Sequence, residues 1–350
     1  MPETLLSTTD RAGPDVQSYL AAPDAPALLA LNFGFTRARV LDTALELGVF
    51  TALASGPRTA EHLARELGCD GTGLQRLLGA LVGLGLLHSC EAGCELSPAA
   101  RAHLVAGTDR YLGAHLRAVM DQWDRWGALT KAVRTGLRPS TDGTGAVGGT
   151  DQGIRPSGMF EGNFPLTFPL AARIVAGLGP TGPARMLDLA AAGGEWGIAV
   201  ALRYPETEVV GVDEAALLKA ARQRAEAFGV ADRITQLPTD FDRLPCDDAS
   251  FDLVTLTHFC RFAGPAHSRR VLRECARVTR PGGRLLIADL MFEPSATEEA
   301  ASLVDLSLFL NTPEGTVLTP AEIRHWLASA GFTTATFLEH GSVPVLMAER

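Results

Sequence analysis

The sequence has no uninterrupted stretch of about 18 apolar residues, the length that a helix needs to cross a bilayer, so we expect no membrane-spanning segment. Its first residues also lack the basic segment followed by an apolar stretch that marks a secretory signal. Of the 6 cysteines, only Cys90 and Cys94 lie close together, and no second pair accompanies them. Neither a zinc site nor disulfides are therefore predicted, and a cytoplasmic protein with reduced thiols fits these absences.

Basic residues are fewer than acidic ones: the sequence has 31 Lys and Arg residues and 40 Asp and Glu residues, and its net charge is −9. A nucleic-acid-binding domain normally carries a basic footprint, so we expect no nucleic-acid partner. The acids and histidines also lack the spacing of metal ligands, so no metal is expected. A chain of 350 residues that is 46% hydrophobic has room for more than one globular domain.

The N-terminal part predicts a small helical domain over residues 26–107, after a loose arm over 1–25. Apolar residues recur at helical spacing, with Thr59 as the N-cap and Gly68 as the end of one helix. A short hairpin is expected around Gly93, and together these elements form a winged-helix pattern. The leucines of its third helix favour a homodimer core over a face that reads a DNA groove.

A helical connector is predicted over 108–180, with a helical stretch from Arg110 to Thr135 and a loop rich in Gly, Pro, Ser and Thr over 136–158. From residue 181 to 350, apolar strands alternate with helices, which predicts a Rossmann-like, doubly wound parallel α/β sheet. The last two segments, TTATFLEH and VPVLMAER, are expected to form an antiparallel hairpin.

The turn after the first of these strands, LDLAAAGGEWG, is built from small residues that let a ligand approach the backbone closely. A dinucleotide site has G-x-G-x-x-G at this turn, but Ala190, Ala192 and Glu195 occupy the glycine positions. Glu195 would also repel a pyrophosphate at the helix N-terminus. The turn therefore favours a cofactor without phosphate.

Acidic residues end the next two strands. Asp213 can accept hydrogen bonds from both hydroxyls of a ribose, although a helix N-cap is the alternative explanation. Asp240 and Phe241 follow the third strand, where they can bind an exocyclic amine and cover an adenine face. The three strand ends together predict a nucleoside site.

The runs LDLAAAGG, GVD, TDFD and RPGGRLLIADL resemble the class I S-adenosylmethionine-dependent methyltransferases. VLDTALELGVFTAL, TAEHLARELG and ELSPAARAHL are similar to the winged-helix dimerisation domain of the O-methyltransferase family of plants and actinomycetes. The resemblance implies an S-adenosyl-L-methionine cofactor and an intertwined homodimer whose N-terminal domain helps to close the partner's site. The cofactor-binding residues that it implies or that the strand ends suggest are Asp188, Ala190, Ala192, Gly194, Asp213, Asp240, Phe241 and Thr257. The family usually has glycine where this chain has Ala190, and often where it has Ala192.

The family's catalytic histidine is absent. The segment THFCRFAGPAHSRRVLRE places Arg261 at that position, and a guanidinium stays protonated and cannot act as a general base. His258 and, less readily, His267 are alternative bases. Three interpretations stay open: methyl transfer needs little base, another residue is the base, or Arg261 serves electrostatic catalysis of a reaction other than methyl transfer.

The resemblance places the substrate beside the segment that precedes the second domain, the Arg261 loop and the segment after Leu290. An apolar pocket with a few polar anchors fits a flat aromatic or polyketide-like secondary metabolite. The sequence therefore predicts a small-molecule O-, N- or C-methyltransferase. The alternatives are a cofactor-retaining hydroxylase, decarboxylase or pericyclic enzyme, and a winged-helix regulator or scaffold. The substrate-contact candidates are Met159, Phe160, Phe164, Phe168, Phe262, Asp305, Phe309 and Asn311.

Overall fold

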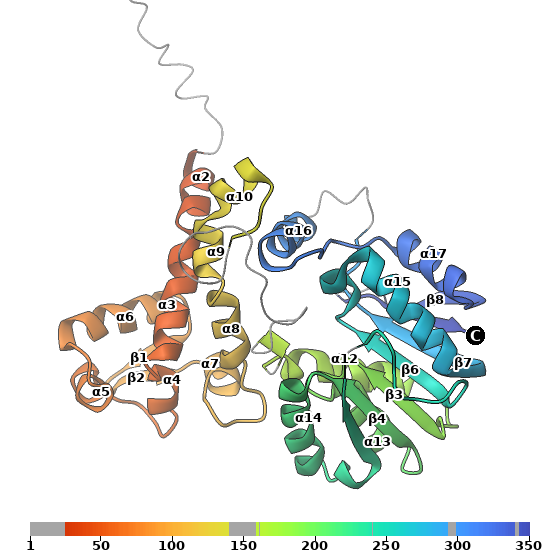
Figure 1. The fold of residues 1–350 in the computed structure, drawn as a ribbon. Helices are drawn as coiled ribbons and strands as arrows, with labels where there is room; N and C mark the ends of the chain where they lie inside the picture. The colour runs from red at the N-terminus through yellow and green to blue at the C-terminus, as the bar shows by residue number, and fades with distance from the viewer. Residues whose placement is uncertain (1–24, 140–158, 161, 240, 293–298, 340–342) are drawn as a thin grey trace, which may run out of the picture.

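The computed structural model describes residues 25–139, 159–160, 162–239, 241–292, 299–339 and 343–350. Figure 1 shows a helical N-terminal lobe beside a C-terminal lobe in which helices cover a twisted sheet. Within the described ranges, no helix is both long enough and apolar enough to span a membrane.

The N-terminal lobe has the winged-helix pattern that the sequence predicts. The Thr59 hydroxyl accepts a hydrogen bond from the His62 amide, and Gly68 ends the same helix with φ 66°. Its core is formed by leucines and other apolar residues between Ala44 and Val105, and the first helix, over residues 25–32, contributes none of them. The elements are α2 (Ala25–Asn32), α3 (Gly34–Glu46), α4 (Val49–Ala52), α5 (Ala60–Leu67), α6 (Gly71–Gly83), β1 (Leu87–Cys90), β2 (Gly93–Leu96) and α7 (Pro98–His103).

The connector is helical where a helical stretch is expected over 110–135. It consists of three short helices, and Gly127, a weak helix former, ends the second of them. A fourth helix leads into the second lobe (Figure 1). These helices are α8 (Gly113–Met120), α9 (Trp123–Gly127), α10 (Leu129–Thr135) and α12 (Phe164–Ala176).

The C-terminal lobe holds a seven-stranded sheet in the order β5-β4-β3-β6-β7-β9-β8. The first five strands are parallel, as predicted. The predicted C-terminal hairpin is confirmed, and its second strand also pairs antiparallel with β7, so the whole sheet is mixed. The strands are β3 (Arg185–Leu189), β4 (Glu208–Asp213), β5 (Ile234–Pro238), β6 (Phe251–Thr257), β7 (Thr279–Ala288), β8 (Thr334–Glu339) and β9 (Val345–Glu349).

Helices lie on both faces of this sheet (Figure 1). One of them, over residues 299–311, was not expected from the sequence, and the stretch near Asp242 that was considered for a helix has none among its described residues. The helices are α13 (Glu195–Arg203), α14 (Ala215–Ala227), the 3₁₀ turn η1 (Ala231–Arg233), α15 (Cys260–Val278), α16 (Glu299–Asn311) and α17 (Pro320–Ala330).

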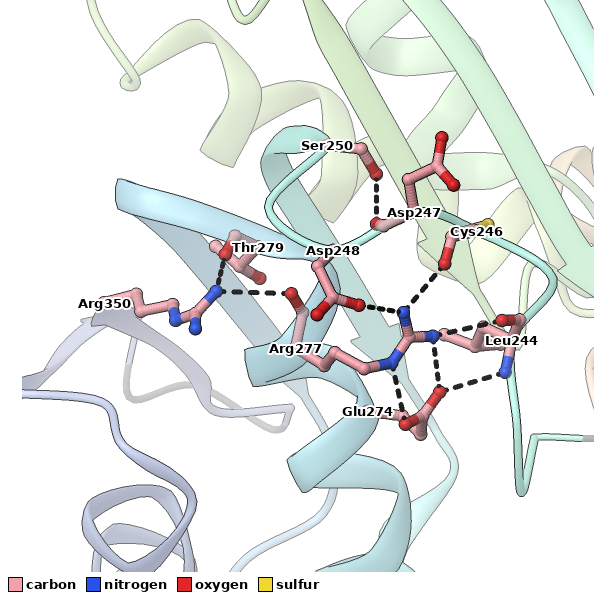
Figure 2. A network of polar contacts seen from close by, with 9 residues as sticks. All are labelled: Leu244, Cys246, Asp247, Asp248, Ser250, Glu274, Arg277, Thr279 and Arg350. Carbon is pink, nitrogen blue, oxygen red and sulfur yellow. Dashed lines mark hydrogen bonds and ion pairs between the residues drawn. The ribbon is translucent and has the colours of Figure 1, made fainter.

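The amino ends of the central strands are fixed by a polar network around Arg277, at the C-terminal end of α15 (Figure 2). Its guanidinium donates to the Leu244 and Cys246 carbonyls at 3.0 and 2.8 Å and to the Glu274 carboxylate at 2.7 Å. The Arg277 hydrogen bonds lower the pKa of Glu274 below its usual value. This network lies opposite the carboxyl ends of the strands, so its role is structural.

Candidate active site

The loop after β3 is tightly turned. Ala190 and Ala192 have φ of 56° and 44°, and Gly194 has φ 83°. A left-handed conformation costs a residue with a side chain about 1–2 kcal/mol, and such strain clusters at functional sites. The glycines that the family usually has at the two alanine positions would adopt this backbone without that cost.

Asp213, the last residue of β4, holds this loop in place. Its carboxylate accepts one hydrogen bond from the Ala192 amide and one from the Glu214 amide, both at 2.8 Å. The side chain is buried at the carboxyl edge of the sheet. The acid predicted to bind ribose therefore lies against the predicted cofactor loop.

Asp188 lies behind the loop and is buried too. Its carboxylate accepts hydrogen bonds from the Thr255 hydroxyl at 2.6 Å and the Gly197 amide at 2.9 Å. Burial raises its pKa to about 7, and repulsion from Glu195 and Asp213 adds to the effect. Three acidic side chains thus lie close enough to interact around the loop.

The other cofactor candidates have different surroundings. Thr257 is buried at the end of β6, on the same edge of the sheet. Phe241 packs edge-to-face against Phe259, with 4.9 Å between ring centroids, inside the core of the lobe. Asp240 lies outside the described residues.

Arg261 and His258 meet at the start of α15. The Arg261 guanidinium contacts the buried Asp289 carboxylate and lies 3.0 Å from His258 Nδ1. A guanidinium can only donate hydrogen bonds, so Nδ1 of His258 is the acceptor and the proton of its neutral ring is on Nε2. His258 is consequently arranged as a hydrogen-bond donor and not as a base. His267, the other histidine considered, lies instead beside Asp242 at 3.3 Å.

A cavity of about 580 Å³ opens beside this pair, within the size range of small-molecule pockets. It lies between the start of α15, the segment before α12, and α12 itself. Half of its lining residues are apolar and half are polar or charged. The lining includes His115, Met159, Phe160, Asn163, Leu166, Thr167, Leu170, Arg173, His258, Arg261, Leu290 and Glu339.

Of the substrate candidates, Met159 and Phe160 line this cavity, and Phe262 packs against Phe160 at 5.5 Å between ring centroids. Phe164 and Phe168 point elsewhere: their rings stack on each other at 4.8 Å between centroids and pack against Phe228, the residue that follows α14. Their pattern of aromatic residues at helical spacing reflects packing against α14.

The three candidates from α16 are also outside the lining of the cavity. Asp305 is exposed and accepts a hydrogen bond from the Val317 amide, and Phe309 is half-buried on the same helix. Asn311 instead joins the two lobes, because Arg125 donates to its side-chain oxygen at 3.1 Å. The sequence analysis did not predict helix α16, and the places of these three residues on that helix keep them out of the cavity lining.

Two residues of the site escaped the sequence analysis. Asp289 follows β7, and its position after a strand is the same signal that identified Asp213. His115 lies on α8, in the helical connector, where the sequence offers no such signal.

Comparison with known proteins agrees with this arrangement. Residues 29–106 match the O-methyltransferase dimerisation domain, and residues 186–283 match a methyltransferase domain. The chain is an S-adenosylmethionine-dependent methyltransferase of the O-methyltransferase family. The predicted family, fold class and cofactor are thereby confirmed.

This methyltransferase is 28% identical over 313 residues to the 3-hydroxy-5-methyl-1-naphthoate 3-O-methyltransferase of Streptomyces sahachiroi, covering 87% of this chain and 89% of the relative. It is 29% identical to the N,N-dimethyltransferase OxyT of Streptomyces rimosus, covering 88% and 90% of the two chains. The structure of human N-acetylserotonin methyltransferase with its S-adenosylmethionine superposes with a TM-score of 0.82 at 21% identity, covering 94% and 99% of the two chains.

The residues at the strand ends fit the methyltransferase cofactor. The loop from Ala190 to Gly194 has no side chain larger than a methyl group. The acids Asp188, Glu195 and Asp213 surround it. Such a set suits ribose hydroxyls and a cationic sulfonium amino acid and disfavours phosphates.

Proposed function

We propose that this methyltransferase modifies a small aromatic or polyketide-like secondary metabolite that binds in the cavity beside Arg261. The observation that carries the proposal is the position of this cavity, which has both apolar residues and the polar pair His258 and Arg261 in its lining. The naphthoate O-methyltransferase relative, named for a flat aromatic substrate, supports the same class. The alternative of a non-methylating reaction gains no support from the relatives named above.

Asp213 is the proposed ligand of the cofactor ribose, and Ala190, Ala192 and Gly194 would lie along its methionine portion. When bound, S-adenosylmethionine supplies an electrophilic methyl group on a sulfonium sulfur. His258, through Nε2–H, and Arg261 would orient the acceptor and stabilise negative charge on it, because both are arranged as hydrogen-bond donors. Asp289 is a positioning residue that fixes the guanidinium.

The dimerisation domain supports a homodimer formed through the N-terminal lobe. An apolar group on α2 and at the start of α3 is more than half exposed in the single chain and would be covered by a second copy. This group consists of Leu28, Leu29, Leu31, Phe33 and Phe35. Light scattering should give the mass of a dimer for the wild type and a smaller mass for a Leu29→Glu, Leu31→Glu double variant.

The test of the function is mass spectrometry of hydroxynaphthoates and hydroxyanthraquinones incubated with the protein and S-adenosylmethionine. We expect a product heavier by one methylene group and an equal amount of S-adenosylhomocysteine. Binding of S-adenosylhomocysteine without methylation of any small aromatic compound would contradict the proposed substrate class.

A further inference from the structure

His115 has the hydrogen-bond arrangement that a general base requires. Its Nδ1 lies 2.9 Å from the Met159 carbonyl oxygen, which can only accept, so Nδ1 carries the proton. In the neutral ring, Nε2 therefore has a lone pair, and the side chain lines the same cavity as Arg261 and His258. This is the opposite arrangement to that of His258, whose Nδ1 is the acceptor.

The backbone around His115 keeps it in this position. Gly162 lies so close that a Cβ atom there would be 2.3 Å from the His115 amide nitrogen. Only glycine permits α8 to approach the segment that carries Met159. This close approach places the backbone of His115, and the hydrogen bond from Nδ1 orients its ring.

We propose that His115, from the connector of the N-terminal lobe, is the general base of the methyl transfer, in place of the family's histidine, at whose position the resemblance puts Arg261. The inference rests on the proposed methylation of a small hydroxylated aromatic compound. With a hydrogen-bond acceptor at His115 and donors at Arg261 and His258, the cavity can both accept a proton from a hydroxyl group and donate hydrogen bonds to its oxygen.

The step balances in atoms and charge. The hydroxyl proton of the acceptor passes to Nε2 of His115, and an oxygen electron pair forms the new O–C bond. The electrons of the broken C–S bond stay on sulfur, which leaves as a neutral thioether. The His115 imidazolium then releases its proton to water, with Nδ1–H still bound to the Met159 carbonyl.

The first test follows the proton without turnover. The probe is 2-hydroxyanthraquinone, whose absorption changes when its phenol ionises, added to the protein with S-adenosylhomocysteine. Near neutral pH we expect the bound dye to show the phenolate band in the wild type and to lose most of it in His115→Ala. Imidazole added to His115→Ala should restore the band by filling the space of the missing ring.

The control is His103→Ala. His103 belongs to the same lobe and also contacts a carbonyl oxygen through Nδ1, that of Arg110 at 3.2 Å, but it does not line the cavity. This variant should retain the wild-type band. A wild type that binds the dye in neutral form or not at all, or a His115→Ala variant that ionises it equally well, would overturn the assignment of the base.

The second test is the rate of methylation of a hydroxynaphthoate. His115→Gln should lower kcat by about 10²–10⁴-fold, the usual contribution of a general base, and remove the acidic limb of its pH profile. If His115→Gln has the same pH profile as the wild type, the proposal is wrong even if the dye ionises. If the dye ionises through His115 and no compound is methylated, the proposed function fails and the proton transfer stands.

Discussion

The Ala192 amide donates a hydrogen bond to the Asp213 carboxylate across 2.8 Å and so ties the loop after β3 to the end of β4. The same carboxylate is the proposed ligand of the cofactor ribose. The geometry of the loop and the affinity for the cofactor should therefore both depend on the Asp213 side chain.

Asp213→Asn should weaken binding of S-adenosylhomocysteine by about ten- to a hundredfold, because hydrogen bonds to a charged group contribute about 1.5–3 kcal/mol. Isothermal titration calorimetry measures the change. Asp232→Asn, an exposed acid in η1, is the matched control and should bind normally. Equal affinities in the two variants would remove Asp213 from the cofactor site.

Ala192→Gly should stabilise the protein, by about 0.5–1 kcal/mol, because glycine adopts a positive φ without the steric cost that alanine incurs. Part of the gain is offset by the larger entropy of glycine in the unfolded chain. Ala191→Gly, at a neighbouring position without positive φ, should destabilise by a similar amount. Urea unfolding distinguishes the two signs, and a loss of stability in both variants would refute a strained loop.

Asp188 should make the protein less stable as pH rises. Its pKa is about 7 in the folded chain and near 3.8 when unfolded, so the folded state binds more protons between these values. The free energy of unfolding attributable to this group therefore falls from about pH 4 to pH 7. Asp188→Asn should flatten this part of the profile in denaturation experiments without cofactor, and an identical slope in both proteins would disprove the effect.

Arg277→Met should lower the free energy of unfolding by about 1–3 kcal/mol, because several carbonyl and carboxylate acceptors lose their donor (Figure 2). The low pKa of Glu274 adds a pH dependence. That contribution is present above the unfolded pKa of Glu274 and is lost as pH falls through the lower folded value. Thermal unfolding of both variants measures the effect. Arg273→Met, on the exposed side of α15, is the control and should change the stability little.

Features set by nearby residues were predictable from the sequence. Thr59 and Gly68 bound their helix as expected, since capping depends on three or four residues. Asp213 lies beside the cofactor loop because parallel strands end at one edge of a sheet. Arg261 and His258 came together because they are three residues apart at a helix start.

Features set by the folding of distant segments were not predictable. His115 reaches the cavity because Gly162, 47 positions later in the chain, lets the backbones approach closely. Phe164 and Phe168 are aromatic, as residues of a substrate pocket often are, but they pack against Phe228, just after α14. The local sequence does not show whether Phe164 and Phe168 line the cavity or pack against Phe228.

Helix α16 touches both lobes. Its last residue, Asn311, binds Arg125 of α9, and in the loop that follows the Thr316 amide donates to the Arg261 carbonyl at 2.9 Å. Gly264 makes room for that loop, since a Cβ there would lie 2.5 Å from the Glu314 carbonyl oxygen. A change in the relative position of the two lobes would therefore reach the backbone of Arg261 through α16 and the loop that follows it.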